Sequence, residues 1–302
     1  MESKALNVLS LFDGMSCGRI ALDRLGANVG KYIASEIDKY AIQVSKNNWD
    51  DIQHIGNVIN VKGNTLPKID LLIGGSPCQS FSFAGKMAGM STKDNIEVVT
   101  LDQYLKLKEE GFEFEGESYL FWEYVRLLKE TSPKYFLLEN VKMKSKWEKI
   151  ISTALGVQPI KINSSLVSAQ SRQRLYWTNI QNVVEPEDRN ILLKDILECG
   201  FTDRDKSHCI DANYFKGGNL KSYFEKHRRQ LVFSGNILGL KDINTREDIS
   251  WRKLLPIECE RLQTVPDNYT AGVSNTQRYK MLGNGWTADA IAHILSFIPE
   301  LK

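Results

Sequence analysis

The feature that most constrains the fold is an apolar run at residues 69–75, which leads directly into Ser76-Pro77-Cys78-Gln79. A short, nearly continuous apolar run that ends at two glycines predicts a buried strand of a parallel sheet. In open α/β sheets, ligands and reactive groups gather at the carboxyl ends of such strands. This position suits a nucleophilic thiol at Cys78, although a small buried hydrophobe is the commoner role of a free cysteine. The run therefore predicts a fold class but leaves two interpretations of the thiol open.

Strands and helices alternate through the first half of the chain. We expect strands at 6–12, 32–35, 69–75 and 135–138, and helices at 19–25, 38–47 and 119–130. This alternation predicts an α/β fold with a doubly wound, mostly parallel sheet. Residues 79–117 are predicted to form a long polar loop. Its first half, residues 80–95, is either a lid over the site or a variable surface insertion.

The alternation stops after residue 180, where turn residues, charges and isolated aromatics follow one another. We therefore expect a sheet domain at 1–180 and a small irregular lobe at 181–253. Helical patterning resumes near residue 254, and the apolar residues of 288–298 are spaced to pack one helix face against a sheet. The segment 254–302 is thus predicted to return to the sheet domain.

The composition is that of an ordinary soluble protein, with 42% hydrophobic and 25% charged residues, and a net charge of +2 does not by itself indicate nucleic acid. The chain has no secretory signal and no apolar run of membrane-spanning length, so we expect a cytoplasmic protein. The spacing of the five cysteines argues against a disulfide framework and against a zinc site. They are Cys17, Cys78, Cys199, Cys209 and Cys259.

A glycine turn follows the first predicted strand, at Phe12-Asp13-Gly14, and Gly18 lies in the helix after it. Such a turn lets a ligand approach the backbone, although the G-x-G-x-x-G pattern is missing. Glu36 ends the second predicted strand, where a carboxylate can accept both hydroxyls of a ribose. The turn and the carboxylate together predict a cofactor that contains a nucleoside; alone, Glu36 is read as a solvated charge at a helix start.

Several short motifs, in this order, resemble those of the cytosine-C5 DNA methyltransferase family. The matching residues are Asp13-Gly14, Glu36, Asn57, Pro77-Cys78, Glu139-Asn140-Val141, Gln170, Arg172, Arg174, 258–263 and 282–285. Each motif alone is weak, but many ordered matches over nearly the whole chain make coincidence improbable. The chain is most similar to small stand-alone or phage-like members, and residues 247–251 and 273–275 resemble the de novo branch. The resemblance implies an S-adenosylmethionine-binding domain at 1–180 and a target-recognition lobe at 181–253.

The family's chemistry implies a role for each catalytic residue. The thiolate of Cys78 adds to C6 of a flipped cytosine, which gives C5 the electron density to accept a methyl group. Glu139 protonates or hydrogen-bonds N3, and Arg174 donates to O2. Arg172 helps to hold the first carboxylate or a phosphate. The residues that bind substrate are expected to be Gln79, Ser80, Asn140, Lys221, Arg228 and Arg229.

The resemblance also implies the cofactor site. The residues concerned are Phe12, Asp13, Gly14, Gly18, Glu36, Ile37, Asn57, Val58, Pro77, Leu120, Asn284, Gly285 and Trp286. Glu36 would bind the ribose, Ile37 would flank the adenine, and Gly285-Trp286 would close over the methionine end. The family usually has aspartate at position 57; Asn57 keeps the carbonyl acceptor for the adenine amino group but loses the charge.

Basic residues of the lobe are candidates for DNA contact. Lys221, Arg228 and Arg229 suit phosphates, although a solvated basic helix would have the same pattern. The leading hypothesis is a monomeric, metal-free enzyme that methylates double-stranded DNA. Its alternatives are the same chemistry on tRNA, and a catalytically silent member of the fold that only binds DNA. The size of the lobe and the form of Ser76-Pro77-Cys78-Gln79 favour DNA methylation.

Overall fold

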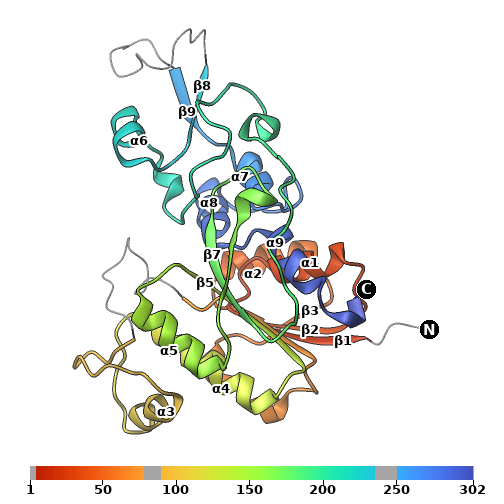
Figure 1. Ribbon diagram of the computed structural model, residues 1–302, viewed down its shortest axis with the longest axis vertical. Coiled ribbons are helices and arrows are strands. Elements are labelled where there is room, and N and C mark those ends of the chain that lie inside the picture. Colours follow the sequence, from red (N-terminus) through yellow and green to blue (C-terminus); the bar gives the residue numbers. More distant parts are fainter. Residues whose placement is uncertain (1–4, 78–89, 235–249, 302) are drawn as a thin grey trace.

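A seven-stranded sheet forms the centre of the protein (Figure 1). The computed structural model describes residues 5–77, 90–234 and 250–301. The strand order is β3-β2-β1-β4-β5-β7-β6. The strands are β1 (Leu6–Leu11), β2 (Val29–Ser35), β3 (Ile52–His54), β4 (Leu71–Gly74), β5 (Tyr135–Val141), β6 (Ile160–Asn163) and β7 (Gln173–Thr178). The strands β1 to β5 pair in parallel, whereas β7 runs antiparallel to both β5 and β6. The predicted doubly wound, mostly parallel α/β fold is therefore confirmed.

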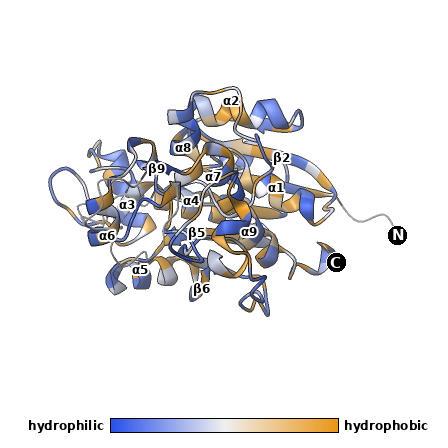
Figure 2. Cartoon of the chain, turned by 90° about the horizontal axis from the view of Figure 1, so that it is seen from above, coloured by the Kyte–Doolittle hydropathy of each residue, from blue (hydrophilic) through white to orange (hydrophobic). Residues whose placement is uncertain are grey.

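Helices cover both faces of this sheet. The helices of the described residues are α1 (Cys17–Arg24), α2 (Lys39–Asn48), α3 (Leu101–Glu109), α4 (Phe121–Thr131), α5 (Ser145–Leu155), α6 (Leu220–Lys226), α7 (Pro256–Leu262), α8 (Asn275–Asn284) and α9 (Ala288–Leu295), of which α6 lies away from the sheet. Successive side chains of β1 point to opposite faces of the sheet. Leu9 lies in the apolar cluster with α4 and α5, and Val8 lies in the cluster with α1 and α9. Figure 2 shows the apolar residues along the strands and on the helix sides that face them. Both faces of the sheet are thus buried, as the apolar runs predict.

The prediction of one long loop at 79–117 is wrong in its second half, which contains α3. Leu101, Tyr104 and Leu107 are spaced along one side of this helix and are buried, while its other side is charged. Thr100 caps the helix by accepting a hydrogen bond from the amide of Gln103 at 3.2 Å. The helix was missed because only three residues of a strongly polar stretch carry the apolar pattern.

Most of the described residues of 181–253, the segment predicted to form the lobe, lie beyond one end of the sheet in Figure 1, although Val183 packs against the cluster that contains α9. The regular elements of the lobe in the described residues are short: α6, several turns of 3-10 helix, and an antiparallel pair made by β8 (Leu231–Ser234) and β9 (Ser250–Lys253). Leu193, Ile210 and Val232 join a cluster that also contains Cys17 of α1 and Leu282 of α8. The base of the lobe therefore shares an apolar core with the helices that flank the sheet.

None of the helices in the described residues is both long and apolar enough to cross a membrane. Within the same residues, no three His, Cys, Asp or Glu side chains gather in a way that could hold a metal ion.

Candidate active site

Three neighbouring strands bring their ends together at one edge of the sheet. Gly74 of β4 pairs with Leu138 of β5 in parallel, so the carboxyl ends of both strands lie at the same edge. Because β7 is antiparallel, its amino end reaches this edge too, and Arg174 pairs with Val141. The antiparallel strand β7 therefore brings Arg174, and Arg172 just before the strand, to the carboxyl ends of β4 and β5.

The end of β5 is bound to the segment that follows β4. The side-chain amide of Asn140 donates to the carbonyl oxygen of Ser76 at 3.2 Å and to its hydroxyl at 3.1 Å. Asn140 is 1% exposed and Ser76 is 4% exposed. These buried bonds fix the backbone that leads into Pro77, one residue before Cys78.

The carboxylate of Glu139 is held at both of its oxygens. Arg174 approaches Oε1 with its Nε at 2.8 Å, and the indole nitrogen of Trp286 donates to Oε2 at 3.0 Å. Glu139 is 9% exposed, so these two charge-assisted contacts act where water screens them little. The sequence implied a functional pairing of Glu139 with arginine but gave no sign of the contact with Trp286.

Gly75 makes this arrangement possible by bringing the backbone close to it. A Cβ atom at residue 75 would lie 2.8 Å from the indole nitrogen of Trp286 and 3.1 Å from Oε2 of Glu139. A side chain there would displace the hydrogen bond between the two residues. Gly75, the residue directly after β4, is therefore explained by the close approach of Trp286 and Glu139.

Arg172 has a different environment from the one expected for it. Its Nη1 donates to the carbonyl of Ile210 at 3.0 Å, and its Nη2 donates to the carbonyls of Gly283 and Gly285 at 3.1 and 2.9 Å. The side chain is nearly inaccessible, at 3% exposure. In the described structure Arg174 makes the ion pair with Glu139, while Arg172 joins the lobe to the segment after α8. Arg174 of β7 and Arg172, which immediately precedes this strand, therefore make different contacts.

The thiol of Cys209, a residue of the lobe, lies beside these arginines. Nη1 of Arg172 is 3.2 Å from Sγ of Cys209. Burial alone would raise the pKa of Cys209, but the guanidinium groups of Arg172 and Arg174 outweigh it and lower the pKa below its ordinary value. No sequence signal could have found this contact, because Cys209 lies in the lobe and belongs to no motif.

The glycine turn after β1 is built around Asp13. Its carboxylate accepts hydrogen bonds from the hydroxyls of Ser10 and Ser16 at 2.5 Å and of Tyr32 at 2.8 Å. Burial raises the pKa of Asp13 to about 6, although the three hydroxyls act in the opposite direction. Phe12 and Ser16, on either side, have φ angles of 56° and 65°, which non-glycine residues rarely adopt. The side chain of Asp13 therefore stabilises a strained turn from within.

Glu36 connects the turn to the end of β2. Its Oε2 accepts from the amide of Gly14 at 2.7 Å, and its Oε1 accepts from the amides of Ile37 and Asp38 at 2.7 and 2.8 Å. A carboxylate has about four acceptor positions, so lone pairs are left for a further donor. Ile37 is a large hydrophobic residue that is 67% exposed beside this carboxylate. An open apolar side chain next to an oriented acceptor fits a nucleoside.

The other residues expected at the cofactor lie on several elements. Oδ1 of Asn57 accepts from the amide of Ile59 at 3.1 Å and so caps a short 3-10 helix in which Val58 is buried. Gly18 is buried in α1 against Ile73 of β4. Pro77 and Leu120 are half-buried, and Asn284 is exposed at the end of α8.

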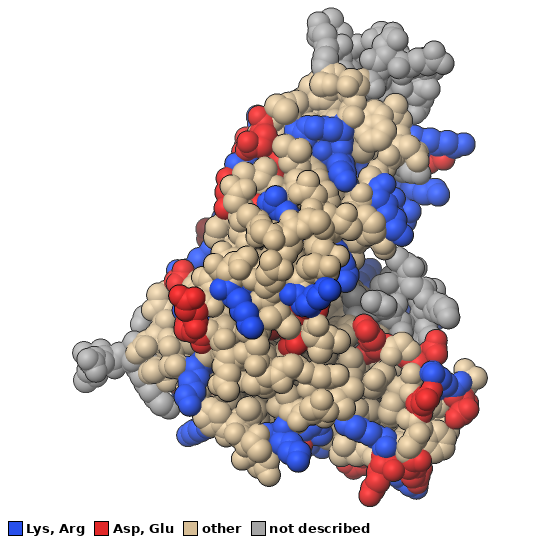
Figure 3. Space-filling model, turned by 180° about the vertical axis from the view of Figure 1, so that it is seen from behind, with Lys and Arg blue, Asp and Glu red and all other residues tan. Residues whose placement is uncertain are grey.

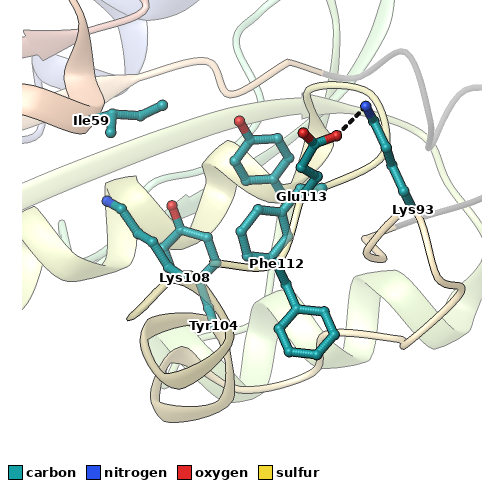
Figure 4. A pocket seen from close by; sticks show the side chains of 8 residues that line it. Ile59, Lys93, Tyr104, Lys108, Phe112 and Glu113 are labelled. Atoms are coloured by element: carbon teal, nitrogen blue, oxygen red, sulfur yellow. Dashed lines mark hydrogen bonds and ion pairs between the residues drawn. The ribbon is translucent and has the colours of Figure 1, made fainter. Parts of the chain in front are cut away.

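A cavity of about 450 Å³ opens beside the expected adenine-binding segments (Figure 4). Ile59, next to Val58, and Tyr119, next to Leu120, are two of its walls. The rings of Tyr104 and Phe114 lie 5.1 Å apart, and an ion pair between Lys93 and Glu113 closes one side. The cavity is therefore bounded largely by α3 and the segment after it, the region that was predicted to be a loop.

Basic residues lie over the lobe. Figure 3 shows Lys and Arg side chains on this part of the molecule, beside a hollow between the lobe and the sheet domain. Lys221 and Arg228 are exposed, and Arg229 is half-buried, with Nη1 donating to the carbonyl of Gly217 at 2.8 Å. Two of the three expected DNA-contacting side chains are thus free to reach a ligand, while Arg229 also supports its own loop.

Cys78, Gln79 and Ser80 lie outside the described residues, as does most of the expected lid at 80–95. The described end of that segment is paired: Ser91 forms a bridge with Glu97, and Thr92 forms one with Phe114. Residues 91–92 are therefore part of the structure around α3.

The sheet topology is that of S-adenosylmethionine-dependent methyltransferases. The chain belongs to the C-5 cytosine-specific DNA methylase family, whose profile matches residues 6–192 and 175–300.

Among its relatives, the type II methyltransferase M1.ScrFI of Lactococcus lactis subsp. cremoris is 28% identical over 97% of this chain and 78% of its own length. The type II methyltransferase M.HhaI of Haemophilus parahaemolyticus is 25% identical over 96% of this chain and 93% of its own. The solved structure of the methyltransferase EhMeth of Entamoeba histolytica superposes with a TM-score of 0.72 at 14% identity, covering 97% of this chain and 98% of that one.

Proposed function

We propose that this protein is a DNA (cytosine-5-)-methyltransferase that uses S-adenosylmethionine and forms a covalent adduct between Cys78 and C6 of a flipped cytosine. The observation that carries the proposal is the carboxyl group of Glu139, held by Arg174 from the neighbouring strand at 2.8 Å. Asn140, the next residue, is bonded to Ser76, two residues before Cys78. Acid, cation and the segment carrying the thiol therefore share one edge of the sheet.

The chain's own residues account for most steps of the reaction. Attack of the Cys78 sulfur on C6 places negative charge on the ring, and Glu139 stabilises this charge by giving or sharing a proton at N3. The guanidinium of Arg174 lies at the same edge and supports the polarised ring. Loss of the C5 proton and departure of the Cys78 sulfur then restore the aromatic ring. A base paired inside a duplex hides C6, so the cytosine must leave the helix first.

S-adenosylmethionine would supply the methyl group, and the residues at the glycine turn fit it. Glu36 has acceptor positions left for ribose hydroxyls, and Ile37 offers an exposed apolar wall for the adenine. Asn57 uses Oδ1 to cap its own turn at 3.1 Å, which leaves one lone pair of that oxygen for the adenine amino group. We infer that binding rests on Glu36 more than on Asn57.

The lobe at 181–253 would hold double-stranded DNA against the sheet domain at 1–180, with 254–302 as the return segment. Exposed Lys221 and Arg228 support this role, because phosphate contacts supply most of the affinity of a protein for DNA. We expect a monomer to be sufficient, since all proposed site residues come from one chain.

The test is transfer of tritium-labelled methyl groups from S-adenosylmethionine to duplex DNA or to tRNA. We expect label in 5-methylcytosine of DNA. Label in tRNA alone would transfer the proposal to RNA, and label in neither would support the catalytically silent alternative. Duplex DNA with 5-fluorocytosine at the target should form an adduct that survives denaturation, because fluorine cannot leave as a proton does. The Cys78→Ser variant should form no adduct yet bind S-adenosylhomocysteine with the affinity of the wild type.

A further inference from the structure

Trp286 contacts the proposed catalytic acid directly. Its indole nitrogen donates to Oε2 of Glu139 at 3.0 Å, on the opposite oxygen from the one that Arg174 approaches. Trp286 is half-buried and packs against both apolar clusters on the side of the sheet that carries α1 and α9. The carboxyl group therefore has a hydrogen-bond donor at Oε2 and the charge of a guanidinium against Oε1.

The backbone next to Trp286 is itself fixed at several points. The carbonyl of Gly285 accepts from Nη2 of Arg172 at 2.9 Å and from Nε2 of Gln263 at 3.0 Å. The amide of Trp286 donates to the thiol of Cys17, which is buried. On the far side, the hydroxyl of Thr287 donates to Gln263 at 2.9 Å. The indole thus projects from an anchored backbone, and its N–H has a defined direction.

We propose that Trp286 is a positioning residue for Glu139, an inference that rests on the proposed function. A carboxyl group has four acceptor positions; the indole occupies one on Oε2, and the guanidinium of Arg174 holds Oε1 by its charge. The plane of the group is then set from both sides, and a proton shared with cytosine N3 can lie only at one of the remaining positions. Without the indole donor, the carboxyl group turns about its side-chain bonds and the acid is less often aligned with the ring.

The variant that tests this is Trp286→Phe, which keeps an aromatic ring for packing but removes the N–H. We expect kcat to fall about 10- to 100-fold, as for the loss of one hydrogen bond to a charged group. The KM and the binding affinity for S-adenosylmethionine should change less than about threefold, because the ring is kept. A loss of activity that follows entirely from weaker cofactor binding would overturn the inference.

The matched control is Trp177→Phe. Trp177 is a buried tryptophan of β7 whose indole nitrogen donates to the hydroxyl of Ser152 at 2.9 Å, on the side of the sheet that carries α5. This variant loses an indole hydrogen bond without touching Glu139, so its kcat should stay near that of the wild type once it is folded. An equal fall in kcat for both variants would point to a general loss of packing and would refute a positioning role.

A double-mutant cycle with Glu139→Gln gives the sharpest readout. The rate of adduct formation with 5-fluorocytosine DNA, followed over hours, remains measurable in slow variants. If Trp286 acts through the acid, Trp286→Phe should slow this rate much less in the Glu139→Gln background than in the wild type. Full additivity would overturn the inference. Absence of methylation and of adduct in the wild type itself would instead overturn the proposed function, so the two failures are distinguishable.

Discussion

The sheet domain and the outer part of the lobe are stabilised by different means. In the sheet domain, apolar residues are fully buried on both faces of the strands, such as Leu9 on one face and Val8 on the other. Among the described residues, the outer lobe has a small apolar cluster of its own, made of Tyr223, Leu231 and Phe233 with a few half-buried neighbours. A deep core keeps reactive groups in fixed positions, whereas a thin one opens at lower free energy. The proposed chemical site therefore lies in a deeply packed region, and the proposed DNA-binding surface lies in a thinly packed one.

A polar network supplements the thin core of the lobe. The hydroxyl of Tyr223 donates to Asp203 and accepts from Nε2 of Gln230 at 2.9 Å. Arg204 pairs with Asp203 at 2.8 Å and lies 2.6 Å from Nε2 of His208. Because arginine can only donate, the histidine nitrogen must accept and the ring is neutral. The lobe thus depends on a set of groups that must all remain correctly protonated.

Arg172 connects the two regions, and its loss should have the largest effect. The Arg172→Ala variant leaves the buried carbonyls of Ile210, Gly283 and Gly285 without this donor. We expect a loss of about 3 kcal/mol or more in the free energy of unfolding, together with loss of methylation. The matched Arg174→Ala variant should lose activity with a smaller change in stability. Urea unfolding and methyl transfer measured on both variants check this, and equal destabilisation would contradict the division of roles.

Gly283 is the next test, because there the two regions touch through their backbones. A Cβ at residue 283 would lie 2.1 Å from the carbonyl carbon of Asp211 in the lobe. The Gly283→Ala variant should therefore push the lobe away from α8, at a cost of about 1–3 kcal/mol. We expect weaker DNA binding with little change in the affinity for S-adenosylhomocysteine, measured by fluorescence anisotropy and by calorimetry. Weakening of both affinities to the same degree would show that the lobe is not displaced independently.

A smaller effect is expected within the lobe. The Tyr223→Phe variant removes a hydroxyl that joins Asp203 to Gln230 in a buried position. We expect a cost of about 1–2 kcal/mol. Hydrogen exchange should accelerate in β8 and α6, while the amides of β1 and β4 keep their protection. Uniform acceleration across the chain would mean that lobe and sheet unfold together, which would contradict the contrast between them.

The smallest expected effect is a dependence on pH. Burial, and next the charge of Arg204, lower the pKa of His208 from its ordinary value of 6.5 to about 4, with Asp203 acting in the opposite direction and His227 adding to the decrease. The unfolded lobe therefore takes up a proton between pH 6.5 and 4 that the folded lobe does not. Stability from this source is complete above pH 6.5 and is lost as the pH falls toward 4. Because His208 is partly solvated, we expect no more than about 1 kcal/mol.

Hydrogen exchange of the lobe at pH 5 and pH 7, corrected for intrinsic rates, measures this loss. The His208→Gln variant keeps a polar side chain that does not titrate. Its lobe should be equally protected at the two pH values, and the same loss in this variant would rule out His208 as the source.

Much of the sheet could be predicted from the sequence because its strands are buried on both faces. Continuous apolar runs such as 69–75 and 135–138 become β4 and β5 with little competition from other patterns. The helix α3 escaped prediction because Leu101, Tyr104 and Leu107 are diluted by charges. Local patterns therefore gave the centre of the fold more reliably than its insertions.

The proposed site was predictable as a set of residue types but not as a set of contacts. The order of the motifs made Glu139 and Arg174 candidates for the same site. The antiparallel pairing of β7 with β5 is the physical reason why these two side chains lie together. The carbonyl partners of Arg172 and the bond from Trp286 to Glu139 depend on packing between distant segments. Such contacts leave no periodicity in the sequence, and only the folded structure reveals them.

The packing of α9 has a consequence for the order in which this protein matures. Ile291 and Ile294 of α9 complete an apolar layer that Val8 of β1 and Leu22 of α1 begin. During synthesis, β1 leaves the ribosome before α9, so it must keep one side uncovered until the lobe has emerged and α9 follows it. Chains stalled before residue 288 should accordingly stay protease-sensitive and be held by chaperones, whereas release of α9 should let the sheet consolidate in one late step.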